Sequence, residues 1–479
     1  MNNKKNLNDG EPQSLGSFFA DFVEIFTKVW YDNRYQTTEW RSFMDYQCKP
    51  LKKGRSYEVT VPGSKSITNR ALLLGALAEG KTLVRGVLFS DDSRVFMKAL
   101  EEIGFSVKID EEKKEVEIEG LGGHVPAGPE RNVYVGSAGT AARFLTAMLA
   151  LSGEHFLVES SEQMKARPME PLLRALEVLG VTFEYLEKPY AFPFRICGRE
   201  ENGVREVDLN IDASSQFLSA LLLSGVMCRE GLQIHLTGTR DARSYVHISM
   251  KMMEEFGVHV EQTGENSYYV APGQTYRCEK GSYQVEPDVS AACYFYGIAA
   301  LSESRVKVMH VHSDSTQGDI RFLDVLRKMG CGVEEENDGI VVKGPKNGKL
   351  HGIHVKMTDF SDQTMTLAAI APFAEGETVI DGIEHIRRQE SDRIRGIVTE
   401  LTRLGIRCEE REDGITIYPG KIISGEVETY DDHRMAMAFS LIGQVVDGIV
   451  IKDAGCCKKT FEDYFDVLTN LDLASKIEE

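Results

Sequence analysis

An apolar run with a polar start recurs six times along the chain. The runs cover residues 64–80, 137–153, 214–231, 288–304, 361–376 and 431–448, and their ends are 73, 78, 73, 72 and 72 residues apart. Such regular spacing indicates a repeated structural unit. In the first run, residues 71–74 and 76–77 are all Ala or Leu, which leaves no polar stripe. A helix without a polar face is buried on every side, so the pattern predicts six buried helices.

A second pattern lies between these runs and keeps step with them. A charged helix, a glycine and an alternating strand follow one another at 99–109, 175–185, 252–262, 325–335 and 400–410. The glycine suits the left-handed position that ends a helix, and the alternation of Phe105, Val107 and Ile109 predicts a half-buried strand. Turns at 337–339 and 412–414 then predict hairpins. One unit therefore reads as strand–helix–strand–helix–hairpin over about 75 residues, with its charged helix outside.

Composition excludes several classes of function. The chain has 479 residues, with 55 Lys and Arg against 74 Asp and Glu, and a formal net charge of −19. Nucleic acids and anionic membranes need a basic surface, so neither is an expected partner. The longest apolar stretch, 217–228, is shorter than the roughly 20 residues that cross a bilayer. Nine scattered cysteines without a CxxC pair argue against a disulfide scaffold or a zinc site, and we expect a cytoplasmic protein.

Residues 1–50 stand outside the repeat. They contain an aromatic-rich stretch that could be helical, but no continuous apolar core of a signal peptide. Their acidic residues also argue against a transit peptide. We expect an accessory or poorly ordered extension, with a partner-binding helix as the alternative.

The starts of the six apolar runs carry the candidate chemistry. A helix N-terminus has unpaired N–H groups and about half a positive charge, so it favours anions. Several such ends facing one cleft would bind a polyanionic ligand, whereas each Ser or Asp taken alone could be a plain N-cap. Basic residues accompany them and supply further anion ligands, unless they form ordinary salt bridges. The start residues are Lys65, Ser66, 137–140, 214–216, 288–290, Asp362 and 432–434, and the basic residues include Arg70, Arg167, Arg393, Arg434 and Lys459.

These motifs resemble one enzyme family. The segments PGSKSITNR (62–70), SAGTAAR (137–143), ARP (166–168), SSQ (214–216), SDQTMT (361–366), QESDR (389–393), DDHRMAM (431–437) and KTFEDYF (459–465) are similar to those of EPSP synthases, the 3-phosphoshikimate 1-carboxyvinyltransferases. The resemblance runs from about residue 57 to the C-terminus. It implies an α/β fold of two inside-out α/β domains, each built from three βαβαββ units around buried parallel helices. The implied domains are 64–285, and 51–63 joined with 286–479, after the extension 1–50.

The resemblance also implies a reaction. The family transfers the enolpyruvyl group of phosphoenolpyruvate to the 5-hydroxyl of shikimate 3-phosphate and releases phosphate, with no metal or cofactor. We expect a monomer whose only partners are these substrates. A UDP-N-acetylglucosamine enolpyruvyl transferase is the alternative enzyme, but no cysteine lies between Cys48 and Cys197 to serve as its general acid. A non-catalytic ligand sensor is the alternative of another class, and it would not need both proton-transfer groups.

Residue roles follow from the same resemblance. The implied catalytic residues are Asp362, Glu390 and Lys65, with Asp362 at the target hydroxyl and Glu390 as a proton relay. The implied phosphoenolpyruvate ligands are Lys65, Gly139, Arg167, Gln216, Arg393, Arg434 and Lys459. The implied shikimate 3-phosphate ligands are Lys65, Ser66, Arg70, Ser214, Ser215, Gln216, Asp362 and Gln389.

Four positions depart from the usual family pattern. They are Ser137 for Asn, Ala242 for Ser, His385 for Asn and Gln389 for Lys. Ordinary family drift is the expected explanation. The alternative is a weakened affinity for shikimate 3-phosphate or a related acceptor.

Overall fold

In the computed structural model, six buried helices begin at the polar starts of the apolar runs. They are α2 (Lys65–Leu77), α4 (Gly139–Leu151), α7 (Gln216–Ser224), α9 (Val289–Ser302), α11 (Thr364–Ile370) and α13 (His433–Ser440). Every residue of α4 is buried, as an all-apolar helix requires. The structure describes residues 45–200, 202–239, 243–474 and 476–477. Most of the predicted extension and Ala242 lie outside the described residues.

The charged helices lie beside these buried ones and end as the sequence predicts. Gly104 (φ 105°) directly follows α3, and Gly330 (φ 104°) lies shortly before β16. Both occupy the left-handed region. One detail of the first hairpin differs from prediction, because Ile109 is 43 % exposed instead of half-buried. The outer helices are α3 (Asp91–Ile103), α6 (Glu170–Val178), α8 (Arg243–Glu255), α10 (Phe322–Lys328) and α12 (Arg393–Arg403), with the short α5 (Glu162–Lys165) and the final α14 (Tyr464–Asn470).

Most repeats form a four-stranded sheet with one topology. In the second repeat, β6 and β7 are parallel, β9 is antiparallel to β7, and β8 is antiparallel to β9 at the far edge of the sheet. The third and fifth repeats have the same order. The strands of these three sheets are β6 (Arg131–Tyr134), β7 (His155–Glu159), β8 (Val181–Tyr185), β9 (Phe194–Arg199), β10 (Glu206–Asn210), β11 (Leu232–Thr237), β12 (Val260–Gly264), β13 (Ser267–Val270), β19 (His354–Lys356), β21 (Thr378–Asp381), β22 (Cys408–Arg411) and β23 (Gly414–Ile417).

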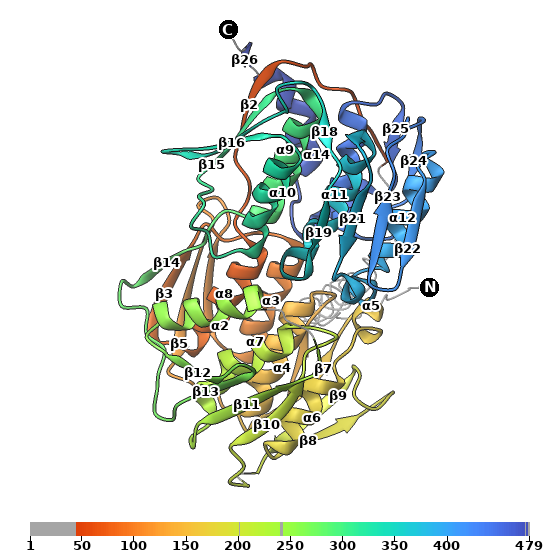
Figure 1. Ribbon diagram of the computed structural model, residues 1–479. Helices are drawn as coiled ribbons and strands as arrows, with labels where there is room; N and C mark the ends of the chain where they lie inside the picture. Colours follow the sequence, from red (N-terminus) through yellow and green to blue (C-terminus); the bar gives the residue numbers. More distant parts are fainter. Residues whose placement is uncertain (1–44, 201, 240–242, 475, 478–479) are drawn as a thin grey trace, which may run out of the picture. The chain divides into compact units, whose positions relative to one another are not determined.

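The first and fourth repeats exchange their first strands. The strand β2, which precedes α2, pairs in parallel with β15, while β14, which precedes α9, pairs in parallel with β3. Figure 1 shows this exchange, with the red β2 beside β15 and the green β14 beside β3. The strands of these sheets are β2 (Arg55–Val59), β3 (Glu79–Arg85), β4 (Ser106–Asp110), β5 (Glu115–Leu121), β14 (Ser282–Gln284), β15 (Arg305–Met309), β16 (Gly332–Glu336), β17 (Gly339–Lys343) and β26 (Lys476–Ile477).

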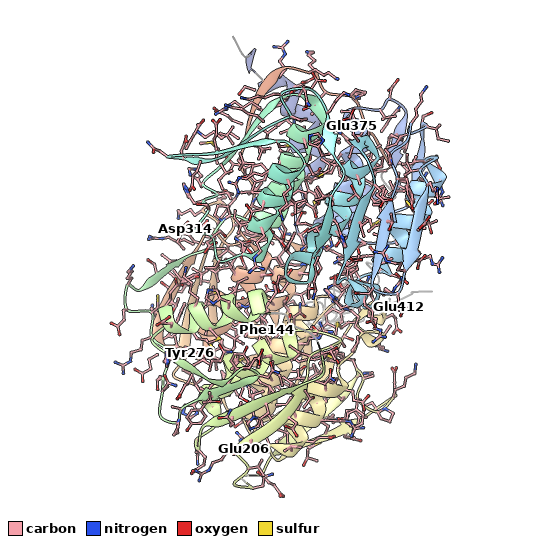
Figure 2. All side chains as sticks on the ribbon, in the orientation of Figure 1. Phe144, Glu206, Tyr276, Asp314, Glu375 and Glu412 are labelled. Atoms are coloured by element: carbon pink, nitrogen blue, oxygen red, sulfur yellow. The ribbon has the colours of Figure 1, made fainter. Side chains whose placement is uncertain are left out.

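The chain therefore passes twice between two hydrophobic cores. One core holds buried residues between Ile67 and Val285, and the other holds buried residues of 48–61 and 289–471. We call the corresponding parts of the chain the first half and the second half. The two crossings lie side by side, because Gly63 pairs with Pro287 in an isolated antiparallel bridge. Figure 2 labels two buried rings of the first core, Phe144 and Tyr276.

The sixth repeat is incomplete and recruits the start of the described chain. Its sheet contains β24 (Gly425–Val427), β25 (Ile449–Ile451) and β1 (Tyr46–Gln47), with β1 antiparallel to β25. Cys48 is only 1 % exposed and belongs to the second core. Residues 46–48 thus pack as part of the second half and not as an accessory extension. A separate two-stranded sheet joins β18 (Leu350–His351) to β20 (Ala374–Glu375). Across the described ranges, no helix is both long and apolar enough to span a bilayer.

Candidate active site

The polar starts of the buried helices meet at one cavity between the two halves. Helices α2, α4, α7 and α13 contribute residues from their first turns, and the 3-10 helix Thr358–Gln363 before α11 contributes Asp362 from its end. The start of α9 lines an adjoining pocket that shares Lys65, Ser66 and Asp362 with the cavity. The cavity is lined by Lys65, Ser66, Arg70, Gly139, Thr140, Arg143, Arg167, Ala213, Ser214, Ser215, Gln216, Tyr245, Asp362, Arg388, Gln389, Glu390, Arg393, His433 and Arg434.

The structure brings together all but one of the predicted site residues. Lys459 is the exception, since it does not line the cavity and contacts Asp431 and Gln163 instead. Sequence reasoning gave no role to Arg143, Arg388 or Ala213, which do line it. A signal for Arg143 was present, because a single arginine in an otherwise apolar buried helix must have a polar partner.

The cavity is strongly basic although the chain is acidic. Seven of its lining residues are Lys or Arg and only two, Asp362 and Glu390, are acidic. His433 adds no positive charge, because burial and the nearby Lys65 and Arg434 hold its pKa well below the ordinary value. Neither ring nitrogen of His433 has a hydrogen-bond partner within the described residues. The site therefore concentrates positive potential where a polyanion would bind.

The helix starts differ between the two halves. No side chain caps α2, α4 or α7 of the first half. In the second half, Asp288 caps α9 and Asp432 caps α13 through bonds to the backbone N–H groups of Ala291 and Arg434. Plain N-capping thus accounts for Asp288 and Asp432 but not for the serines of the first half, and α11 of the second half also begins without a side-chain cap. The uncapped N–H groups there are available to an anion.

A buried ion network organises the second-half side of the cavity. Arg393, which is 1 % exposed, donates to Asp432 Oδ2 at 2.8 Å, Glu390 Oε2 at 2.9 Å and Asp362 Oδ1 at 3.1 Å. Arg434 Nη2 donates to Asp362 Oδ2 at 2.7 Å. Burial alone would raise the pKa of Asp362, but the charges of Arg434 and Arg393 hold it below its ordinary value. Asp362 is therefore an ionised carboxylate held by two arginines, and Tyr245 also donates to it at 2.9 Å.

Glu390 connects the two halves. Its Oε1 lies 3.6 Å from Arg167 Nη1, which extends from the first half. Burial alone would raise the pKa of Glu390, but the charges of Arg167, Arg393 and Lys65 hold it well below its ordinary value. Glu390 thus rests as a carboxylate.

Arg70 is a buried cation of a different kind. Its guanidinium bonds Ser249 Oγ at 2.8 Å, the Ser66 carbonyl at 2.8 Å and Ser219 Oγ at 3.2 Å. It forms no ion pair within the described chain, and burial lowers its pKa to about 10. Its charge is left for a ligand to neutralise, because burying an unpaired charge is costly. Ser214 and Ser215 line the same cavity and are also buried.

Gly139 opens a narrow space at the start of α4. A Cβ atom there would lie 2.7 Å from Arg143 Nη1, 2.8 Å from Arg167 Nη2 and 3.0 Å from Gln216 Oε1. Arg143 Nη1 also donates to Gln216 Oε1 at 2.6 Å. Glycine at this position lets three side chains and a ligand approach one point closely.

Three of the four departures from the family pattern fall on described residues. Gln389 accepts a short hydrogen bond from Arg393 and lines the cavity. The Ser137 carbonyl accepts a bond from Arg167 Nη1 at 3.2 Å. His385 Nε2 lies 2.8 Å from Ser361 Oγ, beside Asp362 in the sequence. Each is integrated into the surroundings of the site.

Comparison with known proteins agrees with this geometry. Residues 52–468 match the family profile described as EPSP synthase (3-phosphoshikimate 1-carboxyvinyltransferase). The chain belongs to the EPSP synthase family.

The relatives cover nearly the whole length of the chain. A 3-phosphoshikimate 1-carboxyvinyltransferase of Nostoc punctiforme is 42 % identical over 407 residues, which are 85 % of this chain and 94 % of that protein. One of Halalkalibacterium halodurans is 39 % identical over 427 residues, or 88 % and 93 %. An EPSP synthase structure from Acinetobacter baumannii matches with a TM-score of 0.75 and 28 % identity, covering 91 % of this chain and all of that one. The chain therefore has the mixed α/β fold of EPSP synthases and their transferase activity in the shikimate pathway of aromatic amino acid biosynthesis.

Proposed function

We propose that the cavity binds phosphoenolpyruvate and shikimate 3-phosphate side by side and transfers the enolpyruvyl group to the 5-hydroxyl. The observation that carries this proposal is the excess of basic residues, seven against two, in a chain of net charge −19. The two substrates together carry two phosphates and two carboxylates. Desolvated cations and helix N-termini can hold these groups close together despite their repulsion.

The phosphoenolpyruvate subsite in this proposal lies where the two halves meet. Its first-half ligands lie near the uncapped start of α4, and its second-half ligands belong to the Arg393 network. Closure of the two halves around the anion would complete the ligand set. The assigned residues are Lys65, Gly139, Arg167, Gln216, Arg393, Arg434 and Lys459.

The shikimate 3-phosphate subsite is assigned to the starts of α2 and α7. The buried charge of Arg70 and the uncapped N–H groups favour the phosphate there. Lys65 and Asp362 would contact the acceptor from either side. The assigned residues are Lys65, Ser66, Arg70, Ser214, Ser215, Gln216, Asp362 and Gln389.

The proposed chemistry needs a base and a proton donor. Asp362 accepts the proton of the 5-hydroxyl while the hydroxyl oxygen attacks C2 of phosphoenolpyruvate. In the same stage, C3 of phosphoenolpyruvate gains a proton. The resulting tetrahedral ketal then loses phosphate and a C3 proton, which restores the enol. Glu390 rests ionised, so it is suited to accept the C3 proton, and Lys65 is suited to donate one. The negative charge of bound phosphoenolpyruvate would offset the positive charges of Arg167 and Arg393. The pKa of Glu390 would then rise toward its ordinary value, at which the carboxylate accepts and returns a proton more easily.

We also propose the finer architecture expected of the family. Two separate cores, six buried helices and the exchange of β2 and β14 support two inside-out α/β domains of three units each. The domain boundaries proposed are 64–285, and 51–63 joined with 286–479, to which residues 46–48 add a strand and a core contact. The monomeric state and the cytoplasmic location stay predictions.

Release of inorganic phosphate on mixing the two substrates tests the proposed reaction. We expect release that requires both substrates and that Lys65→Ala abolishes. Lys81→Ala is the matched control, because Lys81 is 58 % exposed and pairs with Glu117 outside the cavity. Binding of both substrates without phosphate release would favour a sensor, and release with UDP-N-acetylglucosamine would favour the other acceptor.

A further inference from the structure

The ammonium group of Lys459 is already saturated by protein oxygens. Its Nζ lies 2.9 Å from the Asp431 carbonyl oxygen, 2.9 Å from Asp431 Oδ2 and 3.3 Å from Gln163 Oε1. A lysine ammonium has three N–H donors, so these three acceptors use all of them. The side chain of Lys459 is only 13 % exposed. Any anion that binds Lys459 must displace one of these oxygens.

The Asp431 carboxylate is the acceptor that competes most directly with an incoming anion. The carbonyl oxygen of the same residue is fixed by the backbone. The Gln163 amide is held at both ends, since its Nε2 donates to the Glu390 carbonyl at 3.2 Å. The Asp431 side chain is 27 % exposed, so its carboxylate can be reached from solvent. It is also the only one of the three acceptors that carries a negative charge, so it competes directly with an incoming anion.

The backbone turn around Asp431 does not depend on its charge. Tyr430 and Asp431 both have positive φ values, 58° and 54°. The buried Glu400 holds this turn by accepting from Tyr430 OH at 2.5 Å and from the Glu428 N–H at 3.1 Å. Asn and Gly adopt the left-handed region readily, so both can replace Asp431 without altering the turn.

We propose that Asp431 is an affinity-determining residue, whose carboxylate competes with the carboxylate or phosphate of the enolpyruvyl donor for Lys459. The inference rests on the proposed function, in which Lys459 binds that donor. In the unbound enzyme, the Asp431 carboxylate serves as the counter-ion of Lys459, and the donor must replace it. The apparent affinity for the donor is then lower than it would be if Lys459 had no internal counter-ion. The difference in binding free energy equals the strength of the Lys459–Asp431 ion pair.

Steady-state kinetics of Asp431→Asn and Asp431→Gly test this competition. Both variants remove the carboxylate and keep a residue suited to φ 54°. We expect the KM for phosphoenolpyruvate to fall about twofold to fivefold, the range expected for a partly exposed ion pair. The KM for shikimate 3-phosphate stays unchanged, because Lys459, the partner of Asp431, is assigned to the donor subsite and not to the acceptor subsite. A purely structural role would not lower one KM while sparing the other.

Asp45→Asn provides the matched control. Asp45 also pairs with a lysine, Lys452, but in the sheet of β1 and β25 and outside the cavity. This variant should leave both KM values unchanged. A raised or unchanged KM for phosphoenolpyruvate in both Asp431 variants would overturn the inference. Absence of phosphate release from the wild-type enzyme would instead overturn the proposed function, so the two failures are distinguishable.

Discussion

Replacing Gly139 by alanine probes the narrowest point of the site. The added Cβ would lie 2.7 Å from Arg143 Nη1, 2.8 Å from Arg167 Nη2 and 3.0 Å from Gln216 Oε1. Distances below 3.0 Å cannot persist, so the two guanidinium groups must move by a few tenths of an ångström. The movement would loosen the 2.6 Å bond between Arg143 and Gln216 and shift Arg167 from its place beside Glu390.

The size of the effect follows from the type of contact. Overpacking costs about 1–3 kcal/mol. Here the crowded atoms are the flexible ends of polar side chains that line the proposed donor subsite. We therefore expect little change in stability and a KM for phosphoenolpyruvate raised about fivefold to thirtyfold, which corresponds to about 1–2 kcal/mol.

Phosphate release at saturating shikimate 3-phosphate measures that KM, and thermal unfolding measures stability. Gly75→Ala is the matched control, because Gly75 lies within α2 and a Cβ there would meet Ile118 Cδ1 at 3.3 Å, outside the cavity. It should change neither substrate's KM. An unchanged KM for phosphoenolpyruvate in Gly139→Ala would refute the reasoning that Arg143, Arg167 and Gln216 converge on the donor.

Two further substitutions test the buried charges. Arg70→Met removes a buried cation without an ionic partner, but it also leaves the hydrogen-bond partners of Arg70 unsatisfied, so the free energy of unfolding should fall by about 1–3 kcal/mol. The KM for shikimate 3-phosphate should rise at least about tenfold, and an unchanged KM would contradict this. His433 has a lowered pKa, so its contribution to stability is present above the ordinary pKa of 6.5 and is lost below it. Between pH 7.5 and 5.5, urea unfolding should show the wild type losing about 1.4 kcal/mol more than His433→Gln, whereas His259→Gln, at an exposed position, should match the wild type.

The helices and their ends could be predicted because they depend on local pattern. An apolar run fixes a buried helix, and a glycine fixes its left-handed end, as at Gly104 and Gly330. The exchange of β2 and β14 could not be derived from periodicity, because both strands precede a buried helix in the same way. Which sheet each strand joins is decided by tertiary contacts beside the Gly63–Pro287 bridge. Only the family resemblance indicated the crossing there.

Which residues line the cavity could be predicted better than which of their side chains pair with one another. The motifs place nearly all of the cavity residues, since they sit at helix starts with a common register. The sequence does not reveal that Asp432 both caps α13 and holds Arg393, or that Asp431 holds Lys459. These pairs depend on side-chain directions across separate elements. Arg143 was overlooked because its motif was assigned to Gly139, although a lone arginine in α4 required a partner.

The unequal capping of the helix starts suggests how the two halves divide the work of binding. The helix starts of the first half have no side-chain carboxylate as a cap, so a ligand can bind their N–H groups without displacing an internal anion. In the second half, Arg393, Arg434 and Lys459 are already paired with aspartates, so an anion there must compete with an internal carboxylate. The cost of that competition falls mainly on the donor, whose proposed ligands include all three of these cations. Donor affinity should therefore respond more strongly than acceptor affinity to neutralising substitutions of aspartate in the second half.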